Sequence, residues 1–573
     1  MKQHGTIFAR GASQLPQVLA RLGYEKLRKG QDKLIYSLLS GKHTIGILPT
    51  GAGKTAAFLI PALCHKWPLL VFSPLQALMR DQCQGLWEMG IRAGRMSGDQ
   101  TEGESNEAAR DWLKGDLEVL FVAPERMQNA QFKEAMRARG PMIVALDESH
   151  IISEWSDNFR PAYAKVGKFI EDHADTIQVV GAFSATLPQE AEQDVRRVLK
   201  IEDAARIKYY PRRTNLKLSS SSRVSDYDLL PVLKEINGQT IIYCATQKNT
   251  ENVASWLSRQ PGYSGKVVFF HAGLPGDLKR QNQDDFKSGR AQIITATNAF
   301  GMGVDMPNIR GVIHYDMPGT IEALSQESGR AGRDGADSIC HAFFNAQSLY
   351  VHKFLMEMSN PTVEDVMAVF GVLNKACQTS GEKIAQLYGK EIAEPCGVDD
   401  KIVSACIAAL DSSGVIEKLA NDESVGVIRF PDADSEDERE RTKHSIAHDT
   451  GKLFPRYEAM ITKIGVMTTG RNIRFDMKVL AEQMGVQEAT VRANLNKWKR
   501  EDYIYYQPPF MGNTIRMIGG SDKINQERIK QKRKDSISKL RKIEEYFQVP
   551  DEDKHSFLEE YFKDEDEKND DNT

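Results

Sequence analysis

Long apolar runs are missing from this 573-residue sequence. No apolar segment follows a basic start at the N-terminus, and no stretch approaches the roughly 20 apolar residues that a membrane-spanning helix needs. We therefore expect no signal peptide and no membrane partner, and we expect a soluble protein in the cytoplasm. Hydrophobic residues still make up 41% of the chain, which is enough to form several domains of roughly 100–200 residues each.

Paired cysteines are also missing. None of the seven cysteines belongs to a Cys-x-x-Cys pair, and their scattered spacing does not suit the four ligands of a structural zinc site. In a reducing cytosol they are expected to be free and mostly buried thiols. They are Cys64, Cys83, Cys244, Cys340, Cys377, Cys396 and Cys406.

An excess of positive charge is absent from the chain as a whole, whose net charge of −4 argues weakly against a nucleic-acid partner. The acidic residues are unevenly placed. Segment 551–573 has eleven acidic residues and three lysines, a charge of −8, which leaves +4 on the rest of the chain. The body of the chain is thus mildly basic and its tail is acidic.

Short apolar runs alternate with amphipathic stretches up to about residue 345. Runs of roughly four to six apolar residues, each followed by a helical pattern, are typical of buried parallel strands in an α/β sheet. The sequence predicts two α/β lobes, residues 1–215 and 216–345, with a polar linker at Ser219–Ser222. The strand runs are His43–Leu48, Leu69–Phe72, Val119–Val122, Ile143–Leu146, Val179–Ala182, Thr240–Tyr243, Val267–Phe270, Ile293–Ala296 and Gly311–His314.

Helical patterns dominate after about residue 350. Residues 346–440 are predicted to form a helical or winged-helix-like accessory region, which ends in an acidic linker or loop at Asp432–Glu440. Residues 441–520 are predicted to contain a winged-helix domain, because Phe475–Ile518 has the order helix, glycine turn, helix and hairpin. Residues 521–573 are predicted to be a basic helix and an acidic tail.

A glycine-rich segment, Leu48–Thr55, lies between the first strand run and a helical pattern. Glycines let backbone N–H groups close around phosphates at the positive end of a helix, so this segment predicts a nucleotide site. Lys54 would reach the β- and γ-phosphates of ATP, and Thr55 would ligate Mg²⁺. Leu48 departs from the strict pattern, which has glycine there; the alternative is a chance Gly-Lys-Thr in a turn. The expected nucleotide contacts are Thr50, Gly51, Ala52, Gly53, Lys54 and Thr55.

Two acidic residues, Asp147 and Glu148, follow the strand run Ile143–Leu146. An acid at the carboxyl end of a strand can hold Mg²⁺ through water, and a neighbouring acid can orient the attacking water. We assign Asp147 to the metal and Glu148 to the water. The alternative is a structural Asp-Glu pair at a strand end.

Two further pairs of residues complete the predicted ATP site. The Gln31 amide can pair with the adenine edge, and Arg28 can stack on the base. In the second lobe, Arg330 and Arg333 are one helical turn apart. Guanidinium groups brought across a cleft can stabilise charge on the transferred γ-phosphate. The alternative for these arginines is a solvated, charged helix.

In order and spacing these segments resemble the motifs of superfamily 2 helicases, and over about residues 20–345 they resemble the RecQ family of DNA helicases. The resemblance implies two RecA-like lobes with ATP in the cleft between them, and 3′-to-5′ translocation on single-stranded DNA. It rests on Ser73–Gln82, Pro124–Arg126, Trp155 with Phe159–Pro161, Ile242–Cys244, His271–Leu274, Ala296–Asp305 and Gln326–Gly335.

In that family an aromatic-rich loop after the Asp-Glu box senses single-stranded DNA. The resemblance therefore assigns DNA binding and coupling to Trp155, Phe159 and Arg160. Stacking of an aromatic ring on a base is worth roughly 1–3 kcal/mol. Asp157 departs from the histidine usual in the family, and an acid there repels phosphates. The alternative for Trp155 is packing in the core.

The C-terminal part departs further from the family. Most relatives carry a four-cysteine zinc module after the motor lobes, and this sequence lacks one. Segment Arg528–Phe562 resembles a helical pair that bears cysteines in some bacterial members. The helix expected at Glu488–Arg500 can lie along duplex DNA, although a solvated basic face is the alternative. Its candidate DNA contacts are Arg492, Lys497, Lys499 and Arg500.

Three functions stay open. The first is an ATP-dependent 3′-to-5′ DNA helicase, with ATP and Mg²⁺, which acts on single-stranded DNA and duplex junctions in recombination or repair. The second is a superfamily 2 RNA helicase or a translocase that does not unwind. The third is an ATP-gated DNA-binding or strand-annealing protein. The aromatic loop and the two arginines favour a motor, and residues 521–573 are expected to adjust DNA binding.

The purified protein should contain no stoichiometric zinc. Tetrahedral coordination would require distant thiols to gather, because no four Cys or His residues have ligand spacing. Elemental analysis of the purified protein checks this prediction. One zinc per chain would contradict it and would restore the architecture usual in the family.

Overall fold

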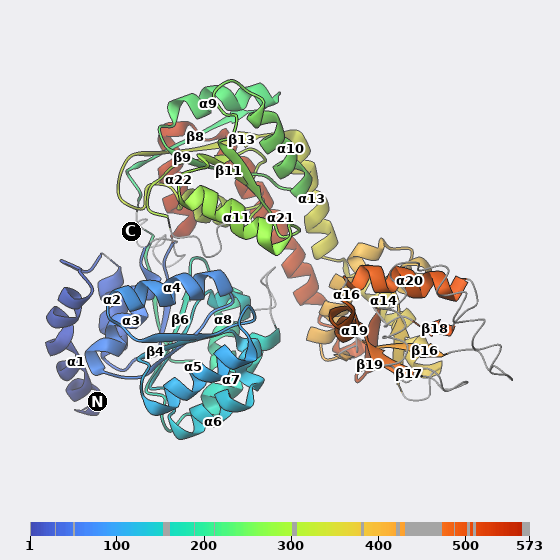
Figure 1. Cartoon of the computed structure of the whole chain (residues 1–573), viewed down its shortest axis with the longest axis horizontal. Helices are drawn as coiled ribbons and strands as arrows, with labels where there is room; N and C mark the ends of the chain where they lie inside the picture. The colour runs from blue at the N-terminus through green and yellow to red at the C-terminus, as the bar shows by residue number, and fades with distance from the viewer. Residues whose placement is uncertain are drawn as a thin grey trace. The chain divides into compact units, whose positions relative to one another are not determined.

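The protein is described from a computed structural model, in which the chain forms two compact units. The first unit comprises Met1–Met356 with Lys534–Thr573, and the second comprises Glu357–Arg533 (Figure 1). The described residues are 2–28, 30–49, 52–152, 161–187, 189–210, 212–300, 306–379, 383–419, 425–429, 473–485, 487–500, 505–507 and 512–563.

The first lobe is built on a seven-stranded parallel sheet of order β3-β4-β2-β5-β6-β1-β7. Three predicted strands have the predicted bounds, because a strand covered on both faces is apolar throughout. The strands are β1 Thr44–Ile47, β2 Leu69–Phe72, β3 Ala93–Met96, β4 Val119–Val122, β5 Ile143–Leu146, β6 Val179–Ser184 and β7 Ala205–Lys208.

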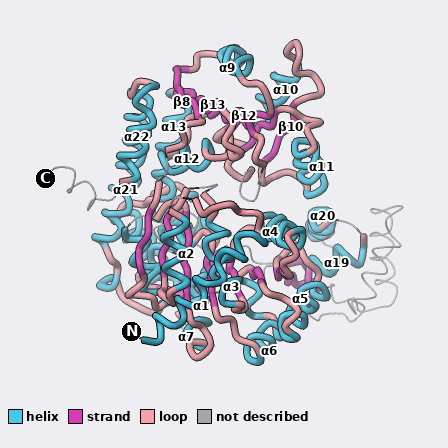
Figure 2. Tube along the Cα trace, turned by 90° about the vertical axis from the view of Figure 1, so that its left-hand side faces the viewer, coloured by secondary structure: helices cyan, strands magenta, loops and turns pink. Residues whose placement is uncertain are grey.

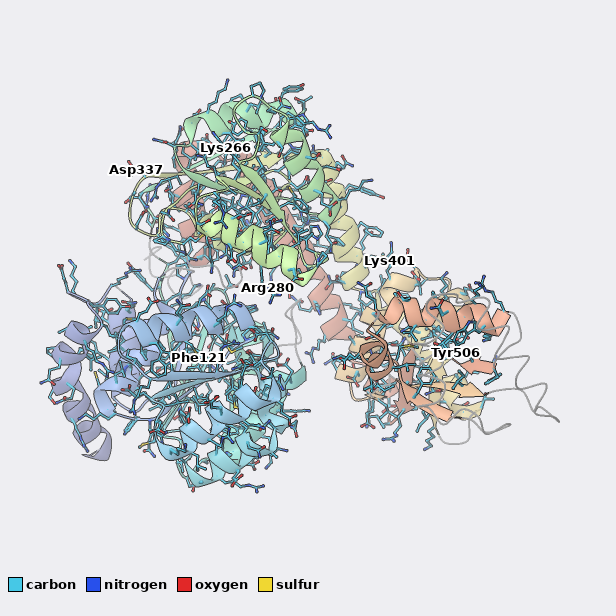
Figure 3. The ribbon with its side chains drawn as sticks, in the orientation of Figure 1. Phe121, Lys266, Arg280, Asp337, Lys401 and Tyr506 are labelled. Atoms are coloured by element: carbon cyan, nitrogen blue, oxygen red, sulfur yellow. The ribbon has the colours of Figure 1, made fainter. Side chains whose placement is uncertain are left out.

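Helices cover both faces of this sheet (Figure 1 and Figure 2). On β2, Leu70 and Phe72 belong to one core cluster with α5–α8, while Leu69 and Val71 belong to another with α1–α4. Phe121 on β4 is buried in the second of these clusters (Figure 3). The helices are α1 Lys2–Arg21, α2 Gln31–Leu39, α3 Lys54–His65, α4 Gln76–Glu88, α5 Glu102–Lys114, η1 Pro124–Gln128, α6 Ala130–Ala138, η2 Ser149–Ile152, α7 Pro161–Asp172 and α8 Gln189–Leu199.

The second lobe has a six-stranded parallel sheet of order β10-β11-β9-β12-β13-β8. Its strands are β8 Leu216–Ser222, β9 Gln239–Tyr243, β10 Val267–Phe270, β11 Ile293–Ala296, β12 Ile309–His314 and β13 Ser338–Phe344. The helices of this lobe are η3 Asp226–Asp228, α9 Leu229–Glu235, α10 Gln247–Ser258, α11 Gly276–Lys287, α12 Ile321–Ser328 and α13 Ala346–Ser359.

The linker predicted at Ser219–Ser222 is wrong, because these serines are four of the seven residues of edge strand β8. The Ser219 and Ser221 hydroxyls lie 2.8 and 3.0 Å from the two ring nitrogens of His341 on β13. Burial lowers the pKa of His341 to about 4, so a neutral ring satisfies both hydroxyls. This pairing lets a polar segment join the sheet.

The C-terminal helix pair, defined as residues 534–562, is part of the second lobe. It comprises the later turns of α21 Gln526–Gln548, then η6 Asp551–Asp553 and α22 Lys554–Phe562. Buried side chains of both helices share a core cluster with β8 and β13. These residues are Leu540, Ile543, Tyr546 and Leu558.

The second unit contains two small antiparallel sheets, of order β14-β19-β15 and β17-β16-β18. These strands add to the mainly helical pattern that the sequence predicts after about residue 350. The strands are β14 Ile384–Leu387, β15 Ile416–Leu419, β16 Val425–Arg429, β17 Ile473–Asp476, β18 Tyr505–Gln507 and β19 Asn513–Met517, and the helices are α14 Val363–Thr379, α15 Gly389–Cys396, α16 Asp400–Ser412, α19 Met477–Met484, α20 Glu488–Arg500 and η5 Ser521–Lys523.

The helix–turn–helix predicted in this unit is present, but among the described residues the two strands after it do not pair with each other as a hairpin. Gly485, with φ of 64°, ends α19 in the left-handed conformation that favours glycine. Strand β18 pairs with β16, whereas β19 pairs with β14 and β15. Tyr506 on β18 is buried against the Phe475 ring (Figure 3).

Six of the seven cysteines are buried and Cys396 is half-buried, as the sequence predicts. Within the part of the chain that the structure describes, no helix has the length and apolar character to cross a membrane.

A buried lysine holds the two helices of the C-terminal pair together. Lys554 is fully buried, and its ammonium donates to the Tyr546 and Val549 carbonyls at 2.9 Å. It also lies 4.3 Å from the centre of the Tyr546 ring. A cation at this place is favourable, because the carbonyls at the C-terminal end of α21 carry partial negative charge.

Lys554→Met should lower the free energy of unfolding by about 1–3 kcal/mol, because it removes the buried ammonium that donates to both carbonyls. Chemical denaturation of the full chain measures this change. The matched control is Lys542→Met, since Lys542 is half-exposed on α21 and pairs only with Glu545 among the contacts described. Equal stabilities of the two variants would contradict the role assigned to Lys554.

Candidate active site

The carboxyl ends of three neighbouring strands bring the predicted site residues together. In the order β5-β6-β1, Asp147 and Glu148 follow β5, Ser184 ends β6, and Lys54 begins the helix after β1. Parallel strands end at one edge of a sheet, and polar side chains there form the usual binding site of an open α/β sheet.

The glycine-rich loop leads into the N-terminus of α3. Thr50 and Gly51 lie outside the described residues, whereas Ala52 and Gly53 are described. Gly53, with φ of 86°, is the N-cap of α3, and a Cβ at this place would collide with the Gln31 amide. The backbone there needs glycine, and the exposed N–H groups of the helix start favour an anion.

Gln31, the first residue of α2, contacts this loop. Its amide nitrogen donates to the Gly53 carbonyl at 3.1 Å, and its oxygen accepts from the Arg28 backbone N–H at 3.0 Å. The two residues assigned to the adenine are thus joined to each other, and Gln31 is joined to the phosphate loop. Contact with adenine stays a prediction.

A buried ion pair stands at the centre of the site. The Lys54 ammonium lies 3.3 Å from Glu148 Oε1, and the two side chains are only 11% and 14% exposed. Burial opposes the charge of Glu148, but the pKa of Glu148 is held below its usual range by Lys54, His150 and Arg330. The carboxylate is therefore charged and able to orient a water molecule.

Glu148 also has an unusual backbone. Its φ is 51°, in the left-handed region that non-glycine residues rarely adopt. Strained residues of this kind gather at functional sites, where the surrounding structure holds them in place. Glu148 Oε2 is buried and accepts no hydrogen bond within the described residues.

Oxygen ligands suited to Mg²⁺ lie in the same place. Asp147 is 4% exposed, and burial together with the Glu148 carboxylate raises the pKa of Asp147. The Thr55 hydroxyl accepts from the Gln82 amide at 2.9 Å. A hard cation prefers such carboxylate and hydroxyl oxygens, and its charge would favour the ionised form of Asp147. The donor set therefore fits Mg²⁺.

His150 links the acidic box to the Ser184 turn. Its Nδ1 lies 3.0 Å from the Ser184 hydroxyl and 3.4 Å from Glu148 Oε2. The Ser184 hydroxyl in turn donates to the Thr186 carbonyl at 2.6 Å. The turn Ser184–Thr186, at the end of β6, is thus linked through His150 to the acidic pair Asp147 and Glu148. Trp155, Phe159 and Arg160, predicted to bind DNA beyond this box, lie outside the described residues.

The two predicted arginines belong to the arginine loop, residues 329–335, which follows α12 in the second lobe. Arg330 is buried, and its charge lowers the pKa of Glu148 and opposes the rise that burial causes in the pKa of Tyr243. Arg333 lines a cavity of about 250 Å³ together with Arg28 and Ala52 of the first lobe. The structure thus brings both arginines to the nucleotide-site residues.

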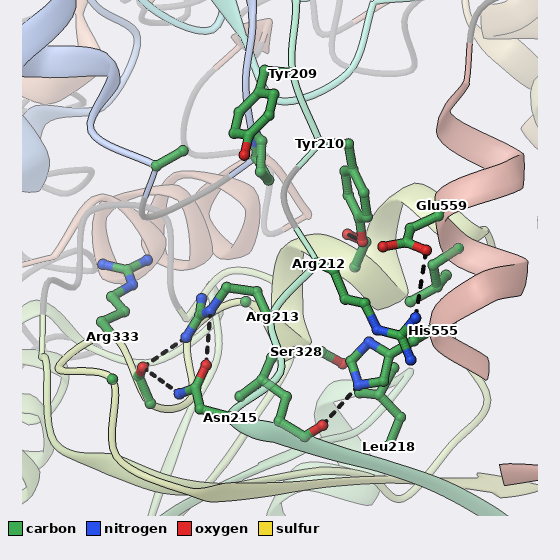
Figure 4. A pocket seen from close by; sticks show the side chains of 18 of the residues that line it. Tyr209, Tyr210, Arg212, Arg213, Asn215, Leu218, Ser328, Arg333, His555 and Glu559 are labelled. Carbon is green, nitrogen blue, oxygen red and sulfur yellow. Dashed lines mark hydrogen bonds and ion pairs between the residues drawn. The ribbon is translucent and has the colours of Figure 1, made fainter. Parts of the chain in front are cut away.

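Two residues that the sequence analysis missed hold this loop. Arg213 donates to the Ala331 and Gly332 carbonyls at 2.9 and 2.7 Å, and Asn215 donates to the Gly332 carbonyl at 2.9 Å (Figure 4). Both follow the last strand of the first lobe. The sequence shows two polar side chains here, but not the distant backbone carbonyls that they bind, so their role could not be predicted.

The predicted DNA-contacting residues of α20 lie off its buried face. Val491, Leu495 and Trp498 are buried, whereas Lys499 and Arg500 are exposed and Arg492 and Lys497 are half-buried. The arrangement leaves a basic face, and its contact with DNA stays a prediction.

Comparison with known proteins identifies the family. A DEAD/DEAH box helicase model matches residues 28–195, and a helicase conserved C-terminal domain model matches residues 224–335. "Probable ATP-dependent DNA helicase RecS" of Bacillus subtilis is 32% identical over 359 residues, which are 62% of this chain and 71% of that protein. This chain belongs to the RecQ family of superfamily 2 helicases.

A second curated relative from Bacillus subtilis is matched over less of its length. "ATP-dependent DNA helicase RecQ" of Bacillus subtilis is 34% identical over 340 residues, which are 59% of this chain and 57% of that protein. This RecQ-family chain spans little more than half the length of the first curated relatives it matches. Dbp5 of S. cerevisiae, bound to RNA and ADP BeF3, superposes with a TM-score of 0.47 at 20% identity, over 60% of this chain and 90% of that chain.

Arg333→Ala should lower kcat for ATP hydrolysis by roughly 10³–10⁵, the range seen when an arginine finger is lost. Affinity for a non-hydrolysable ATP analogue should change little, because the charge is needed mainly in the transition state. Steady-state kinetics and equilibrium binding measure the two effects. Arg197→Ala is the control, since Arg197 is 71% exposed and pairs with Asp194. If Arg333→Ala hydrolyses ATP at the parent rate, Arg333 is a surface residue without a role in hydrolysis.

Proposed function

We propose that the chain is an ATP-dependent DNA helicase that moves 3′-to-5′ on single-stranded DNA and unwinds duplexes in recombination or repair. The observation that carries the proposal is the shared cavity, where Arg333 of the second lobe and Ala52 of the phosphate loop line one space. Membership of the RecQ family supports DNA as the substrate.

In this proposal ATP binding breaks the Lys54–Glu148 ion pair. The triphosphate offers Lys54 a stronger anion, and Lys54 moves from the carboxylate to the β- and γ-phosphates. Glu148 is then free to accept a hydrogen bond from water and to orient it toward the γ-phosphorus. The pair therefore keeps the carboxylate occupied until ATP is present.

The remaining charges act on the phosphates. Mg²⁺, held by Thr55 and Asp147, would neutralise charge on the β- and γ-oxygens. Arg330 and Arg333 would stabilise charge on the transferred group. Arginines from the second lobe act only when the two lobes meet around ATP, which links hydrolysis to relative motion of the lobes.

DNA would be contacted by two separate sets of residues. The resemblance assigns single-stranded DNA to Trp155, Phe159 and Arg160, and the basic face of α20 suits duplex phosphates. Repeated ATP turnover would then move the single strand while the duplex is held.

Unwinding of four matched substrates tests this function. We expect 3′-tailed and forked DNA duplexes to be separated with ATP and Mg²⁺, and 5′-tailed DNA and an RNA duplex to be left intact. ATPase activity should rise with single-stranded DNA. The control is Lys54→Ala, which loses the phosphate contact and should neither hydrolyse ATP nor unwind.

Each other outcome identifies a different function. Unwinding of RNA alone would indicate an RNA helicase, and DNA-stimulated ATPase without strand separation would indicate a translocase. Faster annealing of complementary strands without ATPase would indicate a strand-annealing protein. Any of these would contradict the proposal, as would robust ATP turnover by Lys54→Ala.

A further inference from the structure

The C-terminal helix pair contacts β8, the first strand of the second lobe, through hydrogen bonds to the backbone of that strand. His555 donates from Nε2 to the Leu216 carbonyl at 2.8 Å (Figure 4). The Ser220 backbone N–H donates to the Asp551 carboxylate at 3.1 Å. Because edge strand β8 has only one neighbour in the sheet, these contacts satisfy backbone groups that the sheet leaves over.

The same helix pair contacts Tyr210 and Arg212, in the segment that joins the two lobes. The Phe562 ring stacks on Tyr210, with centroids 4.4 Å apart. The Glu559 carboxylate lies 3.8 Å from Arg212 (Figure 4). Tyr210 in turn shares a hydrogen bond of 2.9 Å with Ser325 on α12.

A third contact reaches α12 directly. The Glu322 carboxylate lies 3.7 Å from the Lys539 ammonium of α21. Helix α12 ends at Ser328, immediately before the arginine loop.

The segments held in this way are the ones that hold the arginine loop. Arg213 and Asn215 lie between Arg212 and Leu216, which the helix pair contacts, and both donate to carbonyls of the loop. The fit is close, because a Cβ on Gly332 would collide with Asn215. Movement of residues 212–216 would therefore move Arg330 and Arg333.

We propose that the C-terminal helix pair positions the arginine loop for ATP hydrolysis, with His555 and Glu559 as its positioning residues. His555 and Glu559 line the same cavity of about 250 Å³ as Arg333 and Ala52. A misplacement of about 1 Å costs roughly 10²-fold in rate when geometry is critical. The helix pair is thus a remote part of the hydrolysis machinery, beyond the role in DNA binding that the sequence predicts.

This inference rests on the proposed ATP hydrolysis and is tested by substitutions in the full chain. His555→Leu removes the donor to Leu216 and keeps the side-chain bulk. We expect kcat to fall roughly 5- to 30-fold, because the arginines are needed most in the transition state. Affinity for ADP–aluminium fluoride should fall by the same factor, while affinity for a non-hydrolysable ATP analogue stays within about twofold.

Two further variants separate positioning from folding. His555→Gln can restore a donor toward Leu216 and should recover most of kcat. Glu559→Gln removes the charge that faces Arg212 and should repeat the kcat loss on a smaller scale, even where His555→Leu does not fold. Lys542→Ala, on the exposed side of α21, should keep the parent kcat.

The readouts distinguish the possible failures. A parent protein that hydrolyses no ATP would contradict the proposed function itself. A parent that hydrolyses ATP, with an unchanged kcat in both folded His555→Leu and Glu559→Gln, would overturn only this inference. A kcat loss with equal loss of both nucleotide analogues, or no recovery in His555→Gln, would also overturn it, because either points to general damage.

Discussion

The buried ion pair between Lys54 and Glu148 is the interaction on which the rest of the site depends. Two charges that are almost fully removed from water need each other, since an unpaired buried charge is strongly destabilising. Strands β1 and β5 end on either side of β6, so the pair joins the start of α3 to the acidic residues after β5, where Glu148 has a left-handed backbone. The triphosphate of ATP can replace the carboxylate as the partner of Lys54, so one event fills the phosphate site and frees Glu148.

The second lobe meets a different constraint, which is the placement of two arginines on a loop. Without supporting contacts the loop would be mobile, and Arg330 and Arg333 would lose their placement relative to the nucleotide site. Residues 212–216 donate to its carbonyls, α12 leads directly into it, and the C-terminal helix pair contacts both of these segments. The helix pair thus completes the second lobe, and its internal cohesion rests on the buried Lys554.

Much of the fold and of the nucleotide site could be predicted from the sequence. Strands such as Leu69–Phe72 and Ile143–Leu146 are buried on both faces, so a continuous apolar run marks them. Lys54, Asp147 and Glu148 were found because their chemistry needs fixed places at strand ends. The polar edge strand Leu216–Ser222 was missed because its stability comes from pairing with His341, a distant residue.

The supporting residues could not be predicted for the same reason. Arg213 and Asn215 bind backbone carbonyls, and a carbonyl has no signature in the sequence. The wrong hairpin has a related cause, since local pattern shows that Tyr505–Gln507 and Asn513–Met517 are extended but not which strands they join. Pairing between distant segments is settled by the packed structure.

The most direct test of the central account is single-turnover hydrolysis of ATP by Glu148→Gln. This substitution keeps the shape and removes the charge, so Lys54 loses its partner in the absence of ATP. The account predicts that the hydrolysis rate falls by roughly 10²–10⁴, the usual contribution of a positioned base. ATP should bind at least as tightly as in the parent, because Lys54 no longer has to leave a carboxylate. Hydrolysis at the parent rate, or a marked loss of ATP affinity, would contradict the account.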